Sequence, residues 1–499
     1  MIFNLHAIVL AAGKATRFNT GNTKVIEKIC GQAMILYPTR LLASLQIDTT
    51  VVIGYQKKTV QKVVQKIHGE SIDFVVQEEQ LGTGHALICA QPLFKKDNIL
   101  IMNADVPLVD KQLITTLYQK HIESGAVFSF VSAHCIDAES RYGRIVEKDG
   151  LLEIVEAKHF VGDYNENCCI NAGIYIARKD FLEKYMHELQ QTGKEFYITD
   201  LVKIASQKKF TVTVLNASFD MVRGVNNYEE LWAVEQIQRA HLIKYWMNQG
   251  VRFFAAQNAH IDLNVTIGTG TFIGAGVHLL GESKIGKQCV IEAFSSIKDS
   301  TIDDHVTVKG HSIVEDSHIY ERALVGPFAH VGPKAKVGAE SCIGNFVEIK
   351  KAVIGKNSKI KHLSYISDAS VGNNVNIGAG TVTCNYDGTH KHQTKIEHNA
   401  FIGTNNSIIA PLTIGKDAFT AAGSTITENV PENALAIARS RQINKLNYAQ
   451  KLRLKQEGLL STSVPQESQN FNDSGDDNQS FIGAVKTNND TSAYPFFDE

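Results

Sequence analysis

The sequence lacks any long apolar run. No stretch of about 18 uncharged apolar residues is present, so nothing in it predicts a helix that spans a membrane. The apolar residues 1–10 lack the basic residues of a secretion signal and lead directly into a glycine turn, so they predict a buried first strand. We therefore expect a soluble, cytoplasmic protein.

The sequence also lacks an excess of charge of either sign. Its 50 basic and 52 acidic residues leave a formal net charge of -2. A chain balanced in this way has no basic footprint for a nucleic acid or an anionic membrane. The balance favours small molecules as partners.

Paired cysteines are missing as well. The eight cysteines include no CxxC motif and no paired spacing, a pattern typical of free thiols in a reducing cytoplasm. The adjacent Cys168 and Cys169 could form a redox element, but neighbours in an apolar run more often divide between core and surface.

Residues 1–226 contain short apolar runs that alternate with helix-like stretches. Runs this apolar are buried on both faces, which predicts a mostly parallel sheet covered by helices, an α/β domain of Rossmann-like type. Residues 227–250 then space Leu231, Val234 and Ile237 as a helix does, and we expect a linker helix closed by Gly250.

A period of six begins beyond residue 250. Each six-residue edge of a hexapeptide β-helix contributes one aliphatic side chain to a stacked interior, so this period predicts a left-handed parallel β-helix over residues 251–449. The clearest series are Val325, Val331, Val337, Ile343 and Ile349, then Ile354, Ile360 and Ile366, and then Ile396, Ile402, Ile408 and Ile414.

Two segments break the period. Residues 384–394 interrupt it, which predicts a loop that leaves the coils, a common place for function. Beyond residue 450 the period is lost, and residues 461–499 are rich in Ser, Asn, Asp, Gln and Gly, so we expect residues 450–499 to form a disordered tail.

A tight turn of small residues follows the first predicted strand. It lies where α/β sheets bind ligands, its backbone N–H groups could approach a nucleotide, and Arg17 could face a phosphate. The turn consists of Leu10, Ala11, Ala12, Gly13, Lys14, Ala15, Thr16 and Arg17. By itself it could be a simple strand-to-helix turn.

Further motifs accompany this turn. In the first half they are Lys24-Val25, Gln77, Gln80-Leu81-Gly82-Thr83-Gly84, Asp105-Val106-Pro107-Leu108, Tyr142-Gly143-Arg144-Ile145, Glu156, Asn171-Ala172-Gly173, Tyr197-Ile198-Thr199-Asp200 and Gly224-Val225-Asn226-Asn227. Their order and spacing strongly resemble the bacterial family of bifunctional N-acetylglucosamine-1-phosphate uridyltransferases and glucosamine-1-phosphate acetyltransferases. The resemblance extends to about Gln442.

For the first domain, the resemblance implies in-line attack of a sugar-1-phosphate oxygen on the α-phosphorus of UTP, with pyrophosphate leaving. Arg17, Lys24 and Mg²⁺ would offset the charge on the phosphates, and Asp105 and Asn226 would be the ligands of Mg²⁺, an ion that prefers oxygen donors. The residues implied to bind UTP or the UDP-sugar are Leu10, Ala11, Ala12, Gly13, Lys24, Gln77, Gly82, Thr83, Asp105, Gly143, Glu156, Asn171 and Asn226, with Gly143, Glu156 and Asn171 on the sugar.

For the second domain, the resemblance implies acetyl transfer from acetyl-CoA to glucosamine 1-phosphate. His362 would be the general base, a role that a neutral imidazole suits near pH 7; Asn385 would orient the reacting groups, and the N–H of Ala379 would stabilise the oxyanion. The implied acceptor contacts are Lys350, Tyr365, Asn376 and Lys391, and the implied acetyl-CoA contacts are Ala379, Asn385, Tyr386, Thr404, Ala422 and Arg439.

The chain departs from the family pattern at several positions. Ala15, Asn103-Ala104 and Ala172 stand where the family has other residues in the first domain, and we expect them to affect rate or sugar choice. In the second domain, Gly332 replaces an arginine that contacts the acceptor phosphate in the family. Loss of a charge-assisted contact costs about 1.5–3 kcal/mol, so we expect weaker acetyl transfer.

Three functions remain open at this point. The first is synthesis of UDP-N-acetylglucosamine in two steps, on a homotrimer with acetyltransferase sites between neighbouring β-helices, as the family has. The second is uridylyl transfer alone, with the β-helix as a trimerising scaffold. The third is a non-catalytic regulatory subunit, against which Arg17, Lys24, Asp105 and Asn226 argue.

Overall fold

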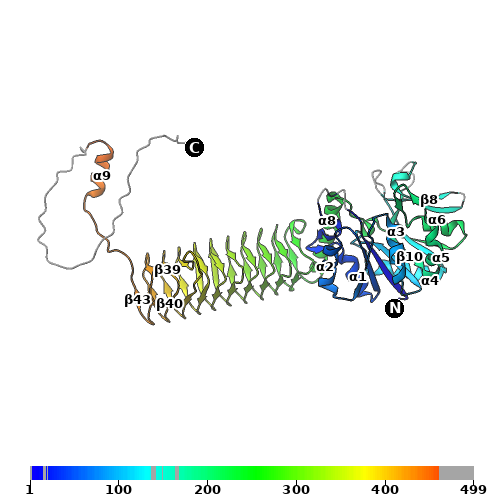
Figure 1. Ribbon diagram of the computed structural model, residues 1–499. Coiled ribbons are helices and arrows are strands. Elements are labelled where there is room, and N and C mark those ends of the chain that lie inside the picture. The colour runs from blue at the N-terminus through cyan, green and yellow to red at the C-terminus, as the bar shows by residue number, and fades with distance from the viewer. Residues whose placement is uncertain are drawn as a thin grey trace. The chain divides into compact units, whose positions relative to one another are not determined.

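The computed structural model describes residues 3–14, 18, 21–135, 142–148, 150–162 and 168–459. The chain divides into two compact units, residues 1–439 and 440–499. The first unit contains an α/β domain and a rod of stacked coils (Figure 1). Each unit is described by itself below.

The α/β domain is built on a twisted sheet whose central strands are buried on both faces. Its strand order is β13-β7-β10-β6-β1-β4-β5, with the hairpin β8-β9 beside β10. The strands are β1 (Leu5–Ala11), β4 (Asp48–Ile53), β5 (Ile72–Val76), β6 (Asn98–Asn103), β7 (Phe128–His134), β8 (Arg144–Lys148), β9 (Leu151–Val155), β10 (Cys169–Arg178) and β13 (Val212–Ala217). Small two-stranded ladders are β2 (Lys28–Ile29) with β3 (Gln32–Ala33) and β11 (Gln191–Thr192) with β12 (Glu195–Phe196).

Strand direction in this sheet is mixed. β1 runs parallel to β4 and β6, but β10 is antiparallel to both β6 and β7. The mostly parallel sheet is therefore interrupted at its centre by one reversed strand. An apolar run buried on both faces reads the same in either direction, so the sequence pattern could not reveal this reversal.

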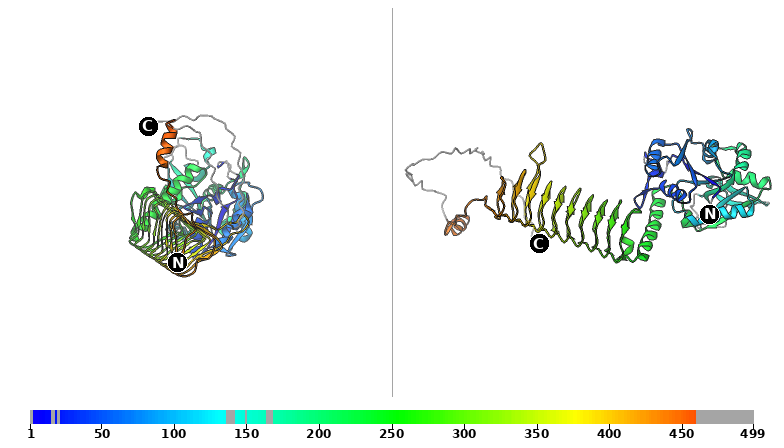
Figure 2. Two further views of the ribbon diagram at one scale, coloured as in Figure 1. Left: turned by 90° about the vertical axis from the view of Figure 1, so that its left-hand side faces the viewer. Right: turned by 90° about the horizontal axis from the view of Figure 1, so that it is seen from below.

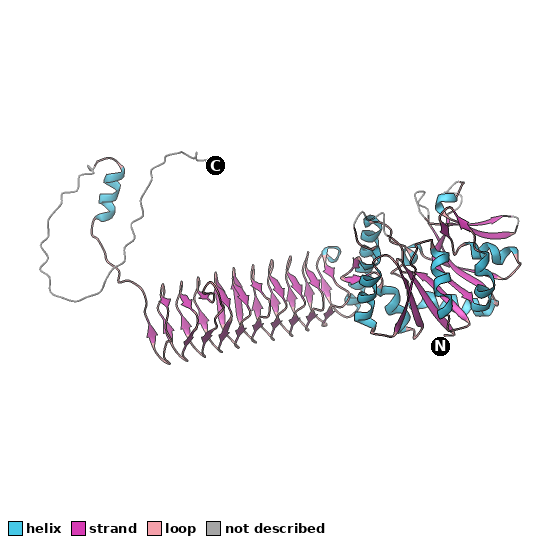
Figure 3. Ribbon diagram, in the orientation of Figure 1, coloured by secondary structure: helices cyan, strands magenta, loops and turns pink. Residues whose placement is uncertain are grey.

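Helices cover both faces of the sheet (Figure 3). Alternate residues of β1 face opposite cores, with Val9 in one buried cluster and Ile8 in the other, as the two-residue period of a strand requires. The helices are α1 (Leu36–Ser44), α2 (Lys57–His68), α3 (Thr83–Ala90), α4 (Lys111–Ser124), α5 (Lys179–Tyr185), α6 (Asp200–Gln207) and α7 (Phe219–Val222). Short 3-10 turns are η2 (Lys24–Ile26), η3 (Gln91–Leu93), η4 (Ala157–His159), η5 (Met186–Glu188) and η6 (Ala256–Asn258).

A long helix, α8 (Tyr228–Asn248), joins the sheet domain to the coils. Asn227 caps it by accepting a hydrogen bond from the N–H of Glu230 at 2.7 Å. Val234 packs in a cluster with residues of the α/β domain, whereas Ile243 packs in the core of the coils. The helix is thus part of both hydrophobic cores.

The rod is a β-helix of three parallel sheets. The first sheet contains β14 (Arg252–Phe253), β17 (Phe272–Ile273), β20 (Val290–Ile291), β23 (Thr307–Val308), β26 (Leu324–Val325), β29 (Cys342–Asn345), β32 (Lys359–His362), β35 (Asn376–Ile377), β38 (Phe401–Ile402), β41 (Phe419–Thr420) and β43 (Leu435–Ala436). The second contains β15 (His260–Ile261), β18 (His278–Leu280), β21 (Ser296–Lys298), β24 (Ile313–Glu315), β27 (His330–Val331), β30 (Glu348–Lys350), β33 (Tyr365–Ser367), β36 (Val382–Cys384), β39 (Ser407–Ile409) and β42 (Thr425–Ile426). The third contains β16 (Thr266–Ile267), β19 (Lys284–Ile285), β22 (Thr301–Ile302), β25 (His318–Ile319), β28 (Lys336–Val337), β31 (Val353–Ile354), β34 (Ala369–Val371), β37 (Thr394–Ile396) and β40 (Leu412–Ile414).

The six-residue period produces the core of this rod. Ile343, Ile360, Ile377 and Ile402 pair in register along the first sheet, and all are buried. One loop, between β36 and β37, leaves the stack at residues 385–393, where the sequence predicted it (Figure 2). The fold class predicted from the sequence, an α/β domain followed by a left-handed β-helix, is confirmed.

The second unit contains a short helix, α9 (Tyr448–Gln456). It overlaps the start of residues 450–499, for which the sequence predicted disorder. Lys451, Leu452, Arg453, Leu454 and Lys455 are good helix formers, and the depletion of aliphatics on which the prediction rested begins only after them. Residues 460–499 lie outside the described residues, so the rest of that prediction stays untested.

Candidate functional site

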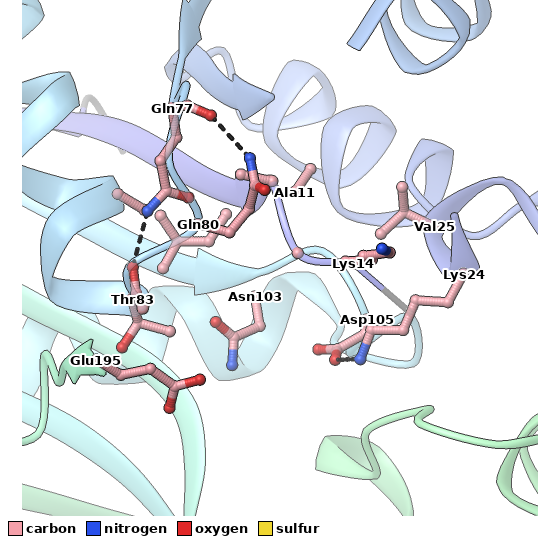
Figure 4. Close-up of a pocket in the computed structure, with 15 residues that line it drawn as sticks. Ala11, Lys14, Lys24, Val25, Gln77, Gln80, Thr83, Asn103, Asp105 and Glu195 are labelled. Atoms are coloured by element: carbon pink, nitrogen blue, oxygen red, sulfur yellow. Dashed lines mark hydrogen bonds and ion pairs between the residues drawn. The ribbon is translucent and has the colours of Figure 1, made fainter. Parts of the chain in front are cut away.

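A cavity of about 460 Å³ opens at the carboxyl ends of β1 and β6. The carboxyl edge of a parallel sheet is where α/β domains bind ligands, because strand ends there place backbone groups and side chains around one crevice. Figure 4 shows its side chains. The lining residues are Leu10, Ala11, Ala12, Gly13, Lys14, Lys24, Val25, Gln77, Gln80, Gly82, Thr83, Ala86, Asn103, Asp105 and Glu195.

The turn after β1 forms one wall of this cavity. Ala11 and Ala12 are buried, whereas the position that a Cβ on Gly13 would occupy has no atom of the chain within 4 Å. The space beside Gly13 is therefore open to a ligand. Arg17, which was predicted to face a phosphate, and Ala15, which was predicted to affect rate or sugar choice, lie outside the described residues.

The opposite wall is built around Gln77 and Gly82. The amide of Gln77 donates to the carbonyl of Gly82 at 3.0 Å and lies 3.1 Å from Nδ1 of His85. Gly82 has a φ of +94°, and a Cβ there would overlap the carbonyl oxygen of Phe196. Only glycine allows β12 to approach the start of α3 this closely, which fixes the hairpin that carries Glu195 against the cavity.

Lys24, Asp105 and Asn226 meet at the cavity, although they come from distant parts of the sequence. The ammonium of Lys24 forms an ion pair with Asp105 and donates to Oδ1 of Asn226 at 2.8 Å. The N–H of Val225 donates to the carbonyl of Asp105 at 3.0 Å, which holds the two segments together. Figure 4 shows Lys24 directed at Asp105. Asn226 itself does not line the cavity but stands behind Lys24.

The donor set around Lys24 fits a hard divalent cation. A carboxylate oxygen and a carboxamide oxygen already converge on one positive charge, the ammonium, which acts here as a stand-in ion. Among the described residues no group of three or more His, Cys, Asp or Glu side chains could hold a metal. Two protein oxygens completed by phosphate oxygens and water are nevertheless what Mg²⁺ usually takes.

The three predicted sugar contacts lie next to one another but do not line the cavity. The N–H of Asn171 donates to the carbonyl of Gly143 at 2.9 Å, and Glu156 stands beside Gly143. Glu156 accepts a hydrogen bond from the hydroxyl of Thr199 at 2.8 Å. Burial raises the pKa of Glu156, and the Thr199 hydroxyl partly opposes that shift.

Asn103 and Glu195 also line the cavity. The sequence marked Asn103 only as a departure from the family pattern, and it did not assign Glu195. Asn103 ends β6, and its side-chain amide lies against Gly173, where a Cβ would displace it. Glu195 forms an ion pair with Lys158 at 2.9 Å. The sequence could have indicated Asn103, because it ends an apolar strand at the edge where ligands bind. It could not have indicated Glu195, which belongs to a short hairpin without an apolar period. Lys14 and Gln80 also line the cavity without having been assigned.

In the β-helix, four predicted site residues share one corner of successive coils. His362, Ala379, Thr404 and Ala422 each follow a first-sheet core residue by two positions, and those core residues pair in register. We call the set Asn345, His362, Ala379, Thr404 and Ala422 the corner column. Neighbouring coils lie about 4.8 Å apart, so these residues follow one another at that spacing along the rod.

The loop after β36 carries three further predicted residues. Asn385 is buried and donates to Oδ2 of Asp368 at 2.5 Å, while Tyr386 and Lys391 pair across the loop. The carboxylate of Asp387 accepts from His392 at 2.7 Å. Backbone N–H groups of His390 and Thr389 and the His392 ring hold the pKa of Asp387 well below its usual range.

The acceptor set is spread over two sheets and this loop. Lys350 and Tyr365 lie on β30 and β33 of the second sheet, whereas Asn376 lies on β35 of the first. Arg439, a predicted coenzyme contact, is the last residue of the first unit and is exposed. The structure therefore brings three of the six coenzyme residues, Ala379, Thr404 and Ala422, into one line, and it distributes the acceptor residues.

Gly332 follows β27, the neighbour of β30. Its φ is +146°, and a Cβ there would overlap the carbonyl of Glu315. His330, two residues before Gly332, is directed at Glu315, with 3.4 Å between Nε2 and Oε1. No side chain larger than hydrogen fits at Gly332 in this backbone.

Comparison with known families divides the chain in the same way. Residues 7–145 match the model of the MobA-like NTP transferase domain. Residues 264–299 match the bacterial transferase hexapeptide model of six repeats, and residues 393–428 match the hexapeptide repeat of succinyl-transferase. These matches fall on the α/β domain and on two parts of the β-helix.

Whole-length relatives share most of the chain. It is 42% identical to the bifunctional protein GlmU of Thermosipho melanesiensis over 447 residues, which cover 89% of this chain and 97% of the relative. It is 40% identical to the protein of the same name from Exiguobacterium sibiricum, over 89% of this chain and 100% of the relative. With that of Thermodesulfovibrio yellowstonii it shares 39%, over 90% of this chain and 100% of the relative.

Proposed function

Because the chain belongs to the family of the bifunctional GlmU proteins, we propose that its two sites work in sequence on one sugar phosphate. The chain is an enzyme with uridyltransferase and glucosamine-1-phosphate acetyltransferase activities. The β-helix acetylates glucosamine 1-phosphate, and the α/β domain joins the product to UMP from UTP. The observation that carries the first domain's role is the convergence of Lys24, Asp105 and Asn226 beside an open turn at the sheet edge.

In the α/β domain the residues bind and orient the two phosphates for in-line attack. The uracil and ribose lie against residues 10–13 and Gln77, and the backbone beside Gly13 leaves the space that the nucleotide needs. Lys24 releases Asp105 and Asn226 and turns to the phosphates, where its charge offsets the developing negative charge. Asp105 and Asn226 would hold Mg²⁺, which would supply further charge stabilisation.

The sugar lies against Gly143, Glu156 and Asn171. Their mutual contacts form one surface joined to the cavity through Asn103. A carboxylate and a carboxamide provide acceptors and a donor for sugar hydroxyl and N-acetyl groups. Asn103 itself is a further candidate contact, because its side chain points into the cavity between Asp105 and Glu195 in Figure 4.

In the β-helix the amine of glucosamine 1-phosphate attacks the thioester carbonyl of acetyl-CoA. A carbon–nitrogen bond forms, His362 takes a proton from the amine, and the carbon–sulfur bond breaks. Coenzyme A leaves as the thiolate, and the protonated His362 returns the proton to its sulfur. The N–H of Ala379 stabilises the oxyanion, and Asn385 orients the reacting groups. The coenzyme lies along the corner column past Thr404 and Ala422 towards Arg439, and Tyr386 contacts it from the loop.

Acceptor binding in this second site depends on Lys350, Tyr365, Asn376 and Lys391 without an arginine at position 332. A missing charge-assisted contact lowers affinity roughly ten- to a hundredfold. We therefore expect acetyl transfer with a high KM for glucosamine 1-phosphate. The missing arginine therefore weakens the acetyltransferase activity in this proposal, which brings the chain closer to the uridyltransferase-only alternative.

The assembled enzyme is a homotrimer in this proposal. Hexapeptide-repeat coils stack into rods with flat faces, and one corner of this rod is apolar and exposed. The rings of Phe294, His311, Phe328 and Phe346 stack in succession at 5.0–5.5 Å, and Leu363 continues the line. We call these the aromatic ladder. Exposed apolar lines of this length mark interaction surfaces, and a second copy of the chain is the partner we assign.

Both reactions take place in the cytoplasm in this proposal. All eight cysteines are unpaired, as expected where thiols stay reduced. In the part of the chain that the structure describes, no helix is both long and apolar enough to cross a bilayer.

The two activities can be tested separately on the full chain. Acetyl-CoA with glucosamine 1-phosphate should release free thiol, and UTP with Mg²⁺ and N-acetylglucosamine 1-phosphate should release pyrophosphate. Lys24→Ala should abolish pyrophosphate release and leave thiol release intact, while His362→Ala should do the reverse. Wild-type protein that released pyrophosphate but no acceptor-dependent thiol would establish the uridyltransferase-only alternative instead.

A further inference from the structure

Two strands of the first sheet extend farther than the strands beside them. Among the described strands of that sheet, β29 (Cys342–Asn345) and β32 (Lys359–His362) each contain four residues, whereas the other strands contain two. The extension pairs Asn345 directly with His362. The ladder therefore continues into the corner of the coil only at the place where the proposed general base stands.

The side chains of this extra pair are in contact. Oδ1 of Asn345 lies 2.6 Å from Nδ1 of His362, and the N–H of Leu363 donates to the backbone carbonyl of Asn345 at 3.1 Å. The second contact ties the two corners together, so the Asn345 side chain is held beside the imidazole. The His362 ring is exposed, and Asn345 is half-buried. The pair therefore contributes little to the core of the rod.

The equivalent corner positions of the neighbouring coils offer His362 no other side-chain partner. Immediately before Asn345 the equivalent corner positions hold Gly310 and Pro327, and after His362 they hold Ala379. These neighbours carry no side-chain hydrogen-bonding group. In the corner column, Asn345 is thus the side chain next to His362 that can direct its ring.

We infer that Asn345 is a positioning residue for acetyl transfer, which selects the imidazole tautomer that lets His362 act as a base. A carboxamide oxygen can only accept, so Nδ1 of His362 carries the proton and donates it to Oδ1. Nε2 then keeps its lone pair for the proton of the amine. This inference rests on the proposed role of His362 in the second site.

The absence of charge on Asn345 affects the protonation of His362, in addition to the position of its side chain. A carboxylate at the same place would favour the charged imidazolium and remove the free base over part of the working pH range. A carboxamide fixes the ring without this effect. In the opposite tautomer the proton lies on Nε2, so Nε2 could not accept the proton of the amine. An imidazole held in the wrong tautomer can lower kcat by orders of magnitude.

The test compares Asn345→Asp and Asn345→Ala by acceptor-dependent thiol release on the full chain. Asn345→Ala should lower kcat about ten- to a hundredfold, with the KM values for acetyl-CoA and glucosamine 1-phosphate changed less than about twofold. Asn345→Asp keeps the acceptor oxygen, so it should retain most of kcat at high pH. Its acid limb in the pH profile of kcat/KM should move about one pH unit upward.

Two controls separate positioning from structural damage. Pyrophosphate release by the same preparations reports on folding of the chain and should equal that of wild type. The KM values are the second control, because a residue that acts through His362 lowers kcat and leaves substrate binding unchanged. Wild-type kcat in Asn345→Ala, or KM values that rise as much as kcat falls, would overturn the inference. Absence of thiol release by the wild-type chain would instead contradict the proposed acetyltransferase function.

Discussion

Glu156 is half-buried, and its negative charge has opposite effects on the proposed sugar binding and on the stability of the fold. Burial raises the pKa of Glu156, so its ionised form is costly in the folded protein. A carboxyl whose folded pKa is raised stabilises the fold at low pH and loses that contribution as pH rises through the folded pKa. At neutral pH the charge on Glu156 therefore destabilises the folded protein, and in the proposed function the carboxylate is retained because it binds the sugar.

Glu156→Gln should raise the unfolding temperature at pH 8, and this gain should shrink towards pH 5. Glutamine keeps an acceptor for the Thr199 hydroxyl but not the charge. The same variant should lose about tenfold or more in kcat/KM for uridylyl transfer, because a charged contact to the sugar is weakened. Thermal melts at the two pH values and pyrophosphate release measure both effects. Equal melting gains at pH 5 and pH 8 would contradict the assignment of the gain to ionisation.

Gly332→Arg should fail to strengthen acetyl transfer. The backbone of Gly332 has a positive φ, and a Cβ would overlap the carbonyl of Glu315. We expect both Gly332→Ala and Gly332→Arg to lose about 2 kcal/mol or more of stability. Gly423→Ala is the matched control, because Gly423 also has a positive φ but open space around its Cβ position. A lower KM for glucosamine 1-phosphate in stable Gly332→Arg protein would disprove this account.

The sequence predicted the individual site residues unevenly. Motifs predicted Lys24, Asp105 and Asn226 as site residues, and the structure brings these side chains into contact from segments far apart in the chain. The sequence did not suggest Asn345, because its proposed role follows from the register of one coil on the next. The signal was nevertheless present, since Asn345 and His362 occupy equivalent positions of successive repeats.

At the scale of elements, α4 and β7 enclose a buried histidine that should make the α/β domain sensitive to acid. Nδ1 of His121 lies 2.7 Å from the hydroxyl of Ser129, and Nε2 lies 3.2 Å from Oδ1 of Asn98. Burial, aided by the charge of Arg178, lowers the pKa of His121 to about 4. The folded state thus holds the ring neutral where the unfolded chain binds a proton.

The sign of the pH effect follows from proton binding. A base with a lowered folded pKa contributes stability above its unfolded pKa, near 6.5, and loses it as pH falls towards 4. This loss is about 3 kcal/mol for His121. His121→Gln should therefore flatten the stability profile between pH 7 and pH 4.5 in denaturant titrations. His241→Gln, which changes an exposed histidine of α8, is the control and should leave the profile unchanged.

Elements were predictable where one physical rule dominates. In the rod, one aliphatic side chain per six residues must enter the core, so the sequence alone located the coils and the loop between β36 and β37. In the α/β domain, the apolar runs located the strands but not the reversed direction of β10. The period of the hydrophobic residues indicates which side chains are buried, whereas the order and direction of the strands depend on tertiary packing.

At the scale of the whole molecule, the aromatic ladder should control assembly. Phe328 lies at its centre and is 49% exposed in a single chain, so a charge there would be buried in the proposed trimer. Phe328→Glu should shift the mass measured by light scattering from trimer to monomer. Thiol release should fall at least about tenfold, because the acetyltransferase sites would form between subunits, while pyrophosphate release should persist.

Ile122→Glu provides the matched control for this change. Ile122 is 51% exposed on α4 of the α/β domain, away from the ladder along the chain. It should leave the trimer and both activities unchanged. A trimeric Phe328→Glu protein with normal thiol release would show that the ladder has another purpose.

Complementation between two variants tests the central claim most directly, namely that one chain carries two sites joined by a released sugar phosphate. Lys24→Ala and His362→Ala proteins are each supplied with glucosamine 1-phosphate, acetyl-CoA, UTP and Mg²⁺, alone and as a mixture. Neither variant alone should make UDP-N-acetylglucosamine, whereas the mixture should make it after a lag in which N-acetylglucosamine 1-phosphate accumulates. Formation of the product by His362→Ala alone, or no product from the mixture, would contradict the account.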